Sequence, residues 1–172
     1  MSRHLACLSI AVLALAAPVA QAASWRLLEV SSDTGLFFFD AHSVTRGGDT
    51  VTVWIRQLKD PGPLEAGRPA VIAAHDEFDC KARSIRTLQA DTLARDGTFL
   101  HSDRRDKPAF FPEAGTPGDR FITIACLPDF PALKHPDLYS AVPGGDMDAY
   151  AARFFADRAR SPAAPPSAGK LP

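Results

Sequence analysis

The chain of 172 residues lacks the short motifs by which common enzymes are recognised. It contains no GxSxG, HExxH, CxxC, P-loop or GxGxxG pattern, so the usual hydrolase, metalloprotease, dithiol and nucleotide sites leave no signature in it. It also lacks an excess of either charge, because 19 Lys and Arg stand against 20 Asp and Glu. Nucleic-acid-binding domains usually concentrate a basic excess, so this balance argues against such a partner.

Long apolar runs are also missing, and none reaches the roughly 20 residues that a membrane-spanning helix needs. The longest run covers residues 5–17, follows the basic start at Arg3 and His4, and leads to Ala20-Gln21-Ala22. This layout is typical of a secretory signal peptide that is cleaved after Ala22. We therefore expect residues 1–22 to be removed and the remaining 150 residues to be exported, to the periplasm or to the cell surface.

Cysteine is scarce, with three in the whole chain. Cys7 lies before most of the apolar run rather than at its cleavage point, so no lipid anchor is expected and this cysteine leaves with the signal peptide. Cys80 and Cys126 remain, and two cysteines in an oxidising compartment favour one disulfide. A catalytic thiol would have to stay reduced beside a possible partner, and a zinc site needs more ligands. A disulfide that closes the chain segment between Cys80 and Cys126 into a loop would stabilise the fold by roughly 4 kcal/mol.

Short apolar stretches separated by turn residues predict a mainly β domain over residues 23–126. Alternation is clearest from Val51 to Leu58, where Val51, Val53 and Ile55 share one face. Gly47-Gly48 before this stretch suits a tight hairpin turn, whereas residues 60–69 and 94–119 read as loops. The expected strands are residues 25–30, 36–40, 51–58, one long or two shorter strands within 71–89, and 121–126.

The segment after Cys126 has a different pattern. Residues 144–160 carry Met147, Tyr150, Ala151 and Phe154 at helical spacing, with Asp146 as N-cap, so the extension 127–160 is predicted to hold an amphipathic helix. Residues 161–172 contain four prolines and almost no bulky apolar side chain, which predicts a disordered tail. The expected fold class is α+β: a twisted antiparallel sheet of about six strands in a meander, with the C-terminal helix packed against it and one disulfide.

The order of the short sequence elements along the chain resembles that of the surface-adhesin protein E-like family of small exported bacterial domains. The resemblance covers roughly residues 25–126 and is carried by Trp25, FFFDAHSV (37–44), VTVW (51–54), DCKARSIRTL (79–88) and FITIAC (121–126). It implies a twisted antiparallel sheet with a helix against it, one disulfide between the two family cysteines, here Cys80 and Cys126, and no known catalysis. The family takes its name from adhesins that attach to host matrix or cell-surface proteins.

Two groups of side chains are candidates for binding a partner: a basic group that suits an acidic partner or a sulfated polysaccharide, and an aromatic group that suits a protein interface. The basic candidates are Lys81 and Arg83, expected on one strand face, with Arg86 further along and Arg104 and Arg105 in the second loop. The aromatic candidates are Trp54, Phe110 and Phe111. A solvated surface and the edge of the core are the competing interpretations of these two groups.

One acidic stretch could serve a metal ion or acid–base chemistry. His75, Asp76, Glu77 and Asp79 offer an imidazole and three carboxylates, but on a strand Asp76 would point away from the other three, as in a solvated strand edge. We expect no metal and no cofactor. The favoured function is a non-catalytic exported binding module for host matrix, cell-surface or envelope proteins. The alternative is a periplasmic small-ligand carrier or an enzyme without a recognisable motif, with a pocket near His75 or His101.

Overall fold

The computed structural model describes residues 23–31, 35–59, 69–94, 96–104, 107–132 and 134–160. The predicted signal peptide, most of the loop predicted over 60–69 and the predicted tail over 161–172 lie outside these ranges. No helix in the described part of the chain is long and apolar enough to cross a membrane.

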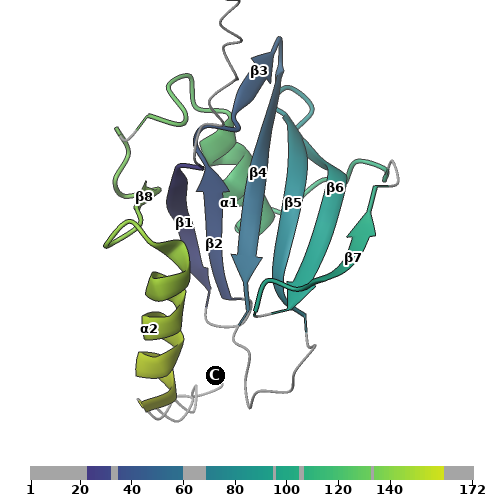
Figure 1. Cartoon of the computed structure of the whole chain (residues 1–172). Coiled ribbons are helices and arrows are strands. Elements are labelled where there is room, and N and C mark those ends of the chain that lie inside the picture. Colours follow the sequence, from purple (N-terminus) through teal and green to yellow (C-terminus); the bar gives the residue numbers. More distant parts are fainter. Residues whose placement is uncertain are drawn as a thin grey trace, which may run out of the picture.

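A single antiparallel sheet forms the centre of the described chain (Figure 1). The strand order is β7-β6-β5-β4-β2-β1-β8, and β3 forms a small hairpin with β4. Neighbours in the sheet are therefore mostly neighbours in sequence, which confirms the predicted meander. The strands are β1 (Trp25–Ser31), β2 (Gly35–Asp40), β3 (Thr45–Gly47), β4 (Thr50–Leu58), β5 (Pro69–Asp79), β6 (Ser84–Ala94), β7 (Phe99–Asp103) and β8 (Ser140–Ala141), and the helices are α1 (Pro117–Ala125) and α2 (Met147–Arg160).

The predicted alternation in β4 divides the sheet into two faces. Val51, Val53 and Ile55 are buried on the face that packs against α1, which we call the inner face. Trp54 and Arg56 lie on the opposite face, the outer face. The predicted tight hairpin turn before β4 is present. Gly47 pairs with Thr50 across a two-residue loop, and the first loop residue, Gly48, has φ 61°.

The inner face is closed by α1 and the segment that follows it. The two cysteines join this layer to the sheet, with a Cα–Cα distance of 5.5 Å between Cys80 after β5 and Cys126 at the C-terminal end of α1. The predicted disulfide is thus present. The largest fully buried side chains of the inner core are Phe39, Val51, Val53, Phe78 and Ile122.

Residues 121–126 were expected as the last strand, and that expectation is wrong, because they form most of α1 and its C-cap. The helix begins where the Thr116 side chain accepts a hydrogen bond from the backbone N–H of Asp119, with Pro117 in the first turn. Residues 121–126 are apolar except at Thr123, and a stretch of six residues fits a strand or one and a half turns of helix equally well. The preceding Thr-Pro-Gly-Asp is a helix start, and it decides the outcome.

Three strands were not expected. β7 lies within the segment predicted as the second loop, and β3 and β8 have only three and two residues. For residues 71–89 the second of the two predicted alternatives is correct, because β5 and β6 are two strands joined by a turn over residues 80–83. Lys81 and Arg83 therefore lie in this turn and do not alternate on a strand face as expected.

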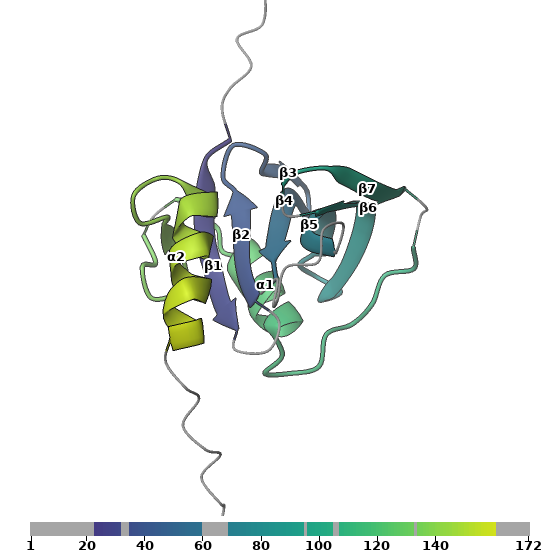
Figure 2. The ribbon, with the colours of Figure 1, turned by 60° about the horizontal axis from the view of Figure 1, so that its bottom comes forward.

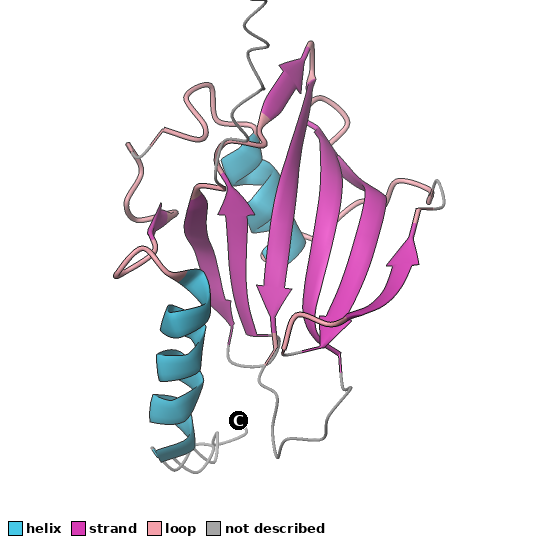
Figure 3. Cartoon of the chain, in the orientation of Figure 1, coloured by secondary structure: helices cyan, strands magenta, loops and turns pink. Residues whose placement is uncertain are grey.

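The second helix packs on the outer face, as predicted for the C-terminal helix. Its N-cap is Asp146, whose Oδ1 accepts a hydrogen bond from the backbone N–H of Ala149 at 2.9 Å. Figure 3 shows α1 behind the sheet and α2 at its lower left. The buried residues Met147, Ala151 and Phe155 of α2 form a second core with Leu36, Phe38 and Leu58 of the sheet. The sheet therefore carries one helix on each face, and α2 covers only one end of the outer face.

Arg46 provides the test of how α1 is held. Its Nη2 donates to the carbonyl oxygens of Ala125 at 3.1 Å, of Phe130 at 3.4 Å and of Leu127, all at or beyond the C-terminal end of α1. Arg46→Ala should lower the free energy of unfolding by about 1–2 kcal/mol, because the helix end loses charge-assisted hydrogen bonds. Urea unfolding would measure the change in unfolding free energy, with the substitution Arg158→Ala at an exposed position of α2 as control. Equal losses in the two variants would contradict the role of Arg46.

Candidate functional site

The exposed large apolar side chains of the described residues lie along one margin of the sheet. They are Phe99 (59% exposed) and Leu100 (38%) of β7, and Phe110 (52%) and Phe111 (70%) of the segment that leads to α1. We call these four residues the apolar edge. They form two pairs, because Phe99 lies beside Leu93 and Phe110 beside Ile85, near opposite ends of β6. Neighbouring exposed apolar side chains of this size mark an interaction surface more often than singly scattered ones do.

The apolar edge is built by two segments that pair with the same strand. β7 pairs with the second half of β6, from Ala90 to Leu93. At the other end of β6, Phe110 exchanges two backbone hydrogen bonds of 2.9 Å with Ile85. Figure 2 shows the segment after β7 leading around this side of the sheet to α1. β7 is the last strand in the sheet order, so its outer side offers backbone groups as well as side chains.

Charged side chains flank the apolar edge. Arg86 forms an ion pair with Glu77 at 2.7 Å, and Lys107 forms one with Asp103 at 2.8 Å. Both pairs border or lie near a polar hollow of about 520 Å³ between β5, β6 and residues 107–109. Arg104 is exposed directly after β7. Arg105 lies outside the described residues. Of the predicted basic candidates, Arg86 therefore lies next to Ile85, the residue that pairs with Phe110, whereas Arg104 lies farther along the same margin, after the residue that pairs with Ala90.

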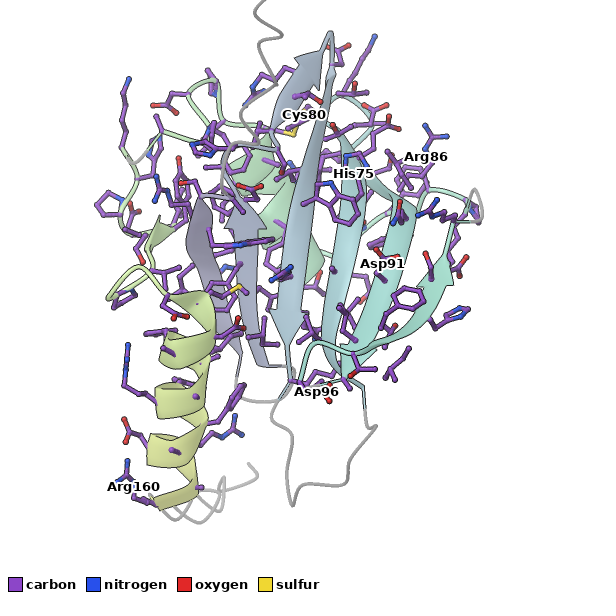
Figure 4. The ribbon with its side chains drawn as sticks, viewed as in Figure 1. His75, Cys80, Arg86, Asp91, Asp96 and Arg160 are labelled. Atoms are coloured by element: carbon purple, nitrogen blue, oxygen red, sulfur yellow. A yellow bond between two sulfur atoms is a disulfide. The ribbon has the colours of Figure 1, made fainter. Side chains whose placement is uncertain are left out.

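Arg83 has a different environment and acts on the scaffold. It has a positive φ of 54°, and its Nη2 lies 2.6 Å from Asp119 Oδ1 and 3.1 Å from Thr123 Oγ1, both on α1. The backbone N–H of Gly115, followed by Arg83, lowers the pKa of the Asp119 carboxyl. Lys81 is exposed in the same turn, next to Cys80 at the end of the sheet labelled in Figure 4.

Trp54 lies on the outer face and is half-buried. Its ring stacks on the ring of His75, with centroids 5.0 Å apart and planes 13° apart, and the guanidinium of Arg56 lies 4.7 Å from the ring centre of Trp25. Burial lowers the pKa of His75, although Glu77 opposes this shift. Figure 4 shows His75 and Asp91 on this face of the sheet. Trp54 therefore belongs to the outer face rather than to the apolar edge.

The acidic stretch of β5 does not converge on one point. His75 and Glu77 lie on the outer face, Asp76 on the inner face, and the Asp79 carboxylate accepts hydrogen bonds from the backbone N–H groups of Lys81 and Ala82. Within the described ranges, no group of three or more His, Cys, Asp or Glu side chains could hold a metal ion. Asp76 is a separate case: burial raises the pKa of its carboxyl to about 6, against the opposing effect of the hydrogen bond from Thr87.

Phe99 and Leu100 were missed as site residues because β7 was missed. The signal was present in Asp96-Gly97, a strong hairpin dipeptide. In the structure Gly97 has φ 83°, and the backbone N–H of Ala94 donates to the carbonyl oxygen of Thr98 at 2.8 Å. A hairpin at this point turns the chain back along β6 and places the side chains of β7 at the margin of the sheet.

Comparison with known proteins gives one positive result. The family model described as Surface-adhesin protein E matches residues 25–127. This range includes the sheet from β1 to β7, α1 and both cysteines of the disulfide, but not α2. Comparison with curated proteins and with solved structures gives no match.

Asp76 gives a test in which the sign is set by its pKa. The folded-state value of about 6 exceeds the ordinary value of 3.8, so the stability that Asp76 allows is present below pH 3.8 and is lost as the pH rises through 6. Between about pH 4 and pH 7, the unfolding free energy of the wild type should fall relative to that of Asp76→Asn by roughly 2 kcal/mol. The lowered pKa of His75 acts in the opposite direction in both proteins. Parallel pH profiles in urea unfolding would contradict the raised pKa.

Proposed function

Because the chain belongs to the surface-adhesin protein E family, we propose that it is an exported, non-catalytic binding module that attaches to other proteins through the apolar edge. Its partners are proteins of the host matrix, of host cell surfaces or of the bacterial envelope. It needs no cofactor for this role. Export follows from the signal peptide proposed over residues 1–22, and the domain proposed over 23–126 carries the binding surface.

The observation that carries this proposal is the exposure of four large apolar side chains, in two pairs, along one margin of the sheet. Hiding one phenylalanine side chain from water contributes about 1.5–3 kcal/mol, so a partner that covers Phe110 and Phe111 gains several kcal/mol from two residues. Aromatic side chains are also the commonest dominant residues of protein interfaces. Lys107, in the segment that leads to Phe110, would favour a partner with acidic groups at the rim of the contact.

The scaffold supports the apolar edge by holding its two segments in place. Phe110 is fixed to Ile85 through backbone hydrogen bonds, and the segment that carries it continues into α1, which the disulfide ties to the β5–β6 turn. A surface that is ordered before binding loses little conformational entropy when a partner docks. The edge strand β7 could in addition pair with an extended segment of the partner.

A small-ligand carrier or an enzyme without a recognisable motif is the alternative function. Such a site needs polar groups that converge in one concave pocket. His75 and Asp76 both have shifted pKa values, but they lie on opposite faces of the sheet. The larger hollow on the outer face is lined mainly by small and aliphatic side chains. The smaller hollow is lined mainly by aromatic rings together with Arg56, Asp40 and Asp91, and neither His75 nor Asp76 lines it. The binding module is therefore the better supported function.

The double substitution Phe110→Ala with Phe111→Ala tests the proposed edge. Exported protein, residues 23–172, would be titrated over immobilised extracellular matrix proteins and over bacterial envelope extract. Both side chains are exposed, so the variant should fold normally but lose about tenfold or more in affinity, because two central aromatic contacts are removed.

Two controls accompany this measurement. The double variant with Tyr at both positions keeps the rings and should keep most of the affinity, and Lys81→Ala in the β5–β6 turn should bind like the wild type. A Phe-to-Ala double variant that binds as tightly as the wild type would rule out the apolar edge. A wild type that retains nothing from either source would count against the binding function itself.

A further inference from the structure

The smaller hollow of the outer face has a volume of about 300 Å³, and its lining residues lie on β1, β2, β4, β5, β6 and β7. Three aromatic rings line it, from Trp25, Trp54 and Phe99, together with three charged groups, from Asp40, Arg56 and Asp91. Ligand sites usually measure roughly 300–1,000 Å³ and hold a few polar groups among apolar ones. The smaller hollow therefore has the size and the mixed lining of a site for one small ligand group.

The strand register places Arg56 and Asp91 on the two sides of Ala73. Arg56 pairs with Ala73 across β4 and β5, and Ala73 pairs with Asp91 across β5 and β6. The guanidinium and the carboxylate thus come from strands two spacings apart, roughly 10 Å. Figure 4 shows Asp91 on the outer face. Because the side chain of Ala73 is a single methyl group, a small ring can lie over it and reach both charged groups with its edges.

Aromatic rings lie on both sides of this row of residues, in the direction of the strands. Trp54 comes two residues before Arg56 on β4. Leu93 comes two residues after Asp91 on β6, and Phe99 pairs with it. Because β4 and β6 are both antiparallel to β5, they run in the same direction. Trp54 and Phe99 therefore lie at opposite ends of the hollow, and a ligand ring in its middle has aromatic surface at either end.

The protein holds both central charged groups in place. Gln89 Nε2 donates to the two carboxylate oxygens of Asp91 at 3.1 and 2.9 Å, and Ser102 Oγ donates to Oδ1 of the same carboxylate at 2.6 Å. A carboxylate has about four acceptor positions, so Asp91 can accept a further hydrogen bond. The guanidinium of Arg56 lies 4.7 Å from the ring centre of Trp25, a contact that fixes it without neutralising its charge. Groups that are ordered before a ligand arrives lower the entropy cost of binding.

The lining selects a neutral ligand that carries hydroxyl groups. An anion would be repelled by Asp40 and Asp91, and a cation would leave the N–H donors of Arg56 without an acceptor. A pyranose sugar has hydroxyl groups around its edge, and each of them can accept from a guanidinium or donate to a carboxylate. Its C–H groups can pack against aromatic rings. A sugar therefore satisfies the rings, the donors and the acceptors of the hollow together.

We propose that the smaller hollow binds a neutral pyranose sugar at the end or on a branch of a glycan. The sugar ring lies over Ala73. Its hydroxyl groups accept hydrogen bonds from Arg56 and donate one to Asp91, and its C–H groups contact an aromatic ring at either end of the hollow. This site goes beyond the proposed function, because the apolar edge contacts protein surface. Phe99 belongs to both surfaces, so a substitution there would not separate them.

Tryptophan fluorescence of the exported protein, residues 23–172, provides the readout, because both tryptophans of the chain line the hollow. The probes are the methyl glycosides of D-glucose, D-galactose and D-mannose, and N-acetyl-D-glucosamine. At least one of these sugars should change the emission saturably, with a Kd on the order of 1 mM for a single sugar ring. No saturable change with any of them would overturn the proposal.

Two salts test the selection for a neutral ligand. Tetramethylammonium chloride supplies a cation that can stack on aromatic rings, and sodium acetate supplies an anion that can pair with Arg56. Neither salt should change the tryptophan emission saturably. Half-saturation by either salt at a lower concentration than by every sugar would overturn the proposal.

A matched pair of substitutions locates the sugar. Asp91→Asn and Glu77→Gln each replace a carboxylate by an amide on the outer face, but Glu77 does not line the smaller hollow. Asp91→Asn should weaken binding of the best sugar about tenfold or more, because a hydrogen bond to a charged acceptor is lost. Glu77→Gln should leave the affinity unchanged, and so should the double variant Phe110→Ala with Phe111→Ala, which separates this site from the apolar edge. Equal affinities of Asp91→Asn and Glu77→Gln would contradict binding in the hollow.

A measurement on the wild type covers the case in which Asp91→Asn does not fold, since this carboxylate also accepts hydrogen bonds within the sheet. The two indole N–H signals of a ¹H–¹⁵N correlation spectrum belong to Trp25 and Trp54. At least one of them should move as the sugar is added, whereas the amide signal of Gly145, which does not line the hollow, should stay. Sugar-induced shifts elsewhere that leave both indole signals unchanged would overturn the proposal.

Discussion

The disulfide between Cys80 and Cys126 is the constraint on which the rest of the structure depends. α1 has only nine residues, and a helix of this length is unstable on its own in water. Three attachments keep it on the inner face: the disulfide at its C-terminal end, the bonds of Arg83 to Asp119 and Thr123, and the bonds of Arg46 to the last carbonyl groups. Together they close the inner core without a long helix or a second sheet.

Because the inner face is closed, function has to be sought on the remaining surfaces. The outer face is half covered by α2, and its central residues Trp54 and His75 stack on one another. The margin formed by β7 and the segment at Phe110 is different, since its large apolar side chains are exposed to water. Natural proteins usually protect such edges with charges or with covering segments. Here charged pairs flank the margin but leave its large apolar side chains exposed. The proposed binding role would account for this exposure, and it agrees with membership of an adhesin family.

Much of the scaffold could be predicted from the sequence, and the errors have physical causes. β4 and α2 were predicted because their signals are local: alternation over eight residues in β4, and an N-cap followed by helical spacing in α2. The disulfide was predicted because two cysteines remain once Cys7 is removed. α1 was mistaken for a strand because residues 121–126, apolar except at Thr123, are too few to separate the two periods, and its start signal at Thr116 was read as part of a loop. The site was only half found. Phe110 and Phe111 could be named as candidates, but their position on the same margin of the sheet as Phe99 requires the pairing of distant segments with β6, which no local pattern specifies.

The most direct test of the central constraint is the number of reactive thiols in the exported protein. The chain would be recovered from the medium or the periplasm, unfolded in denaturant with an alkylating reagent before and after reduction, and weighed intact by mass spectrometry. We expect a mass that starts at residue 23, no label before reduction and two labels after it, because Cys80 and Cys126 are joined to each other and Cys7 has been removed. Two labels before reduction would show that α1 is not covalently attached to the sheet, and would contradict the account.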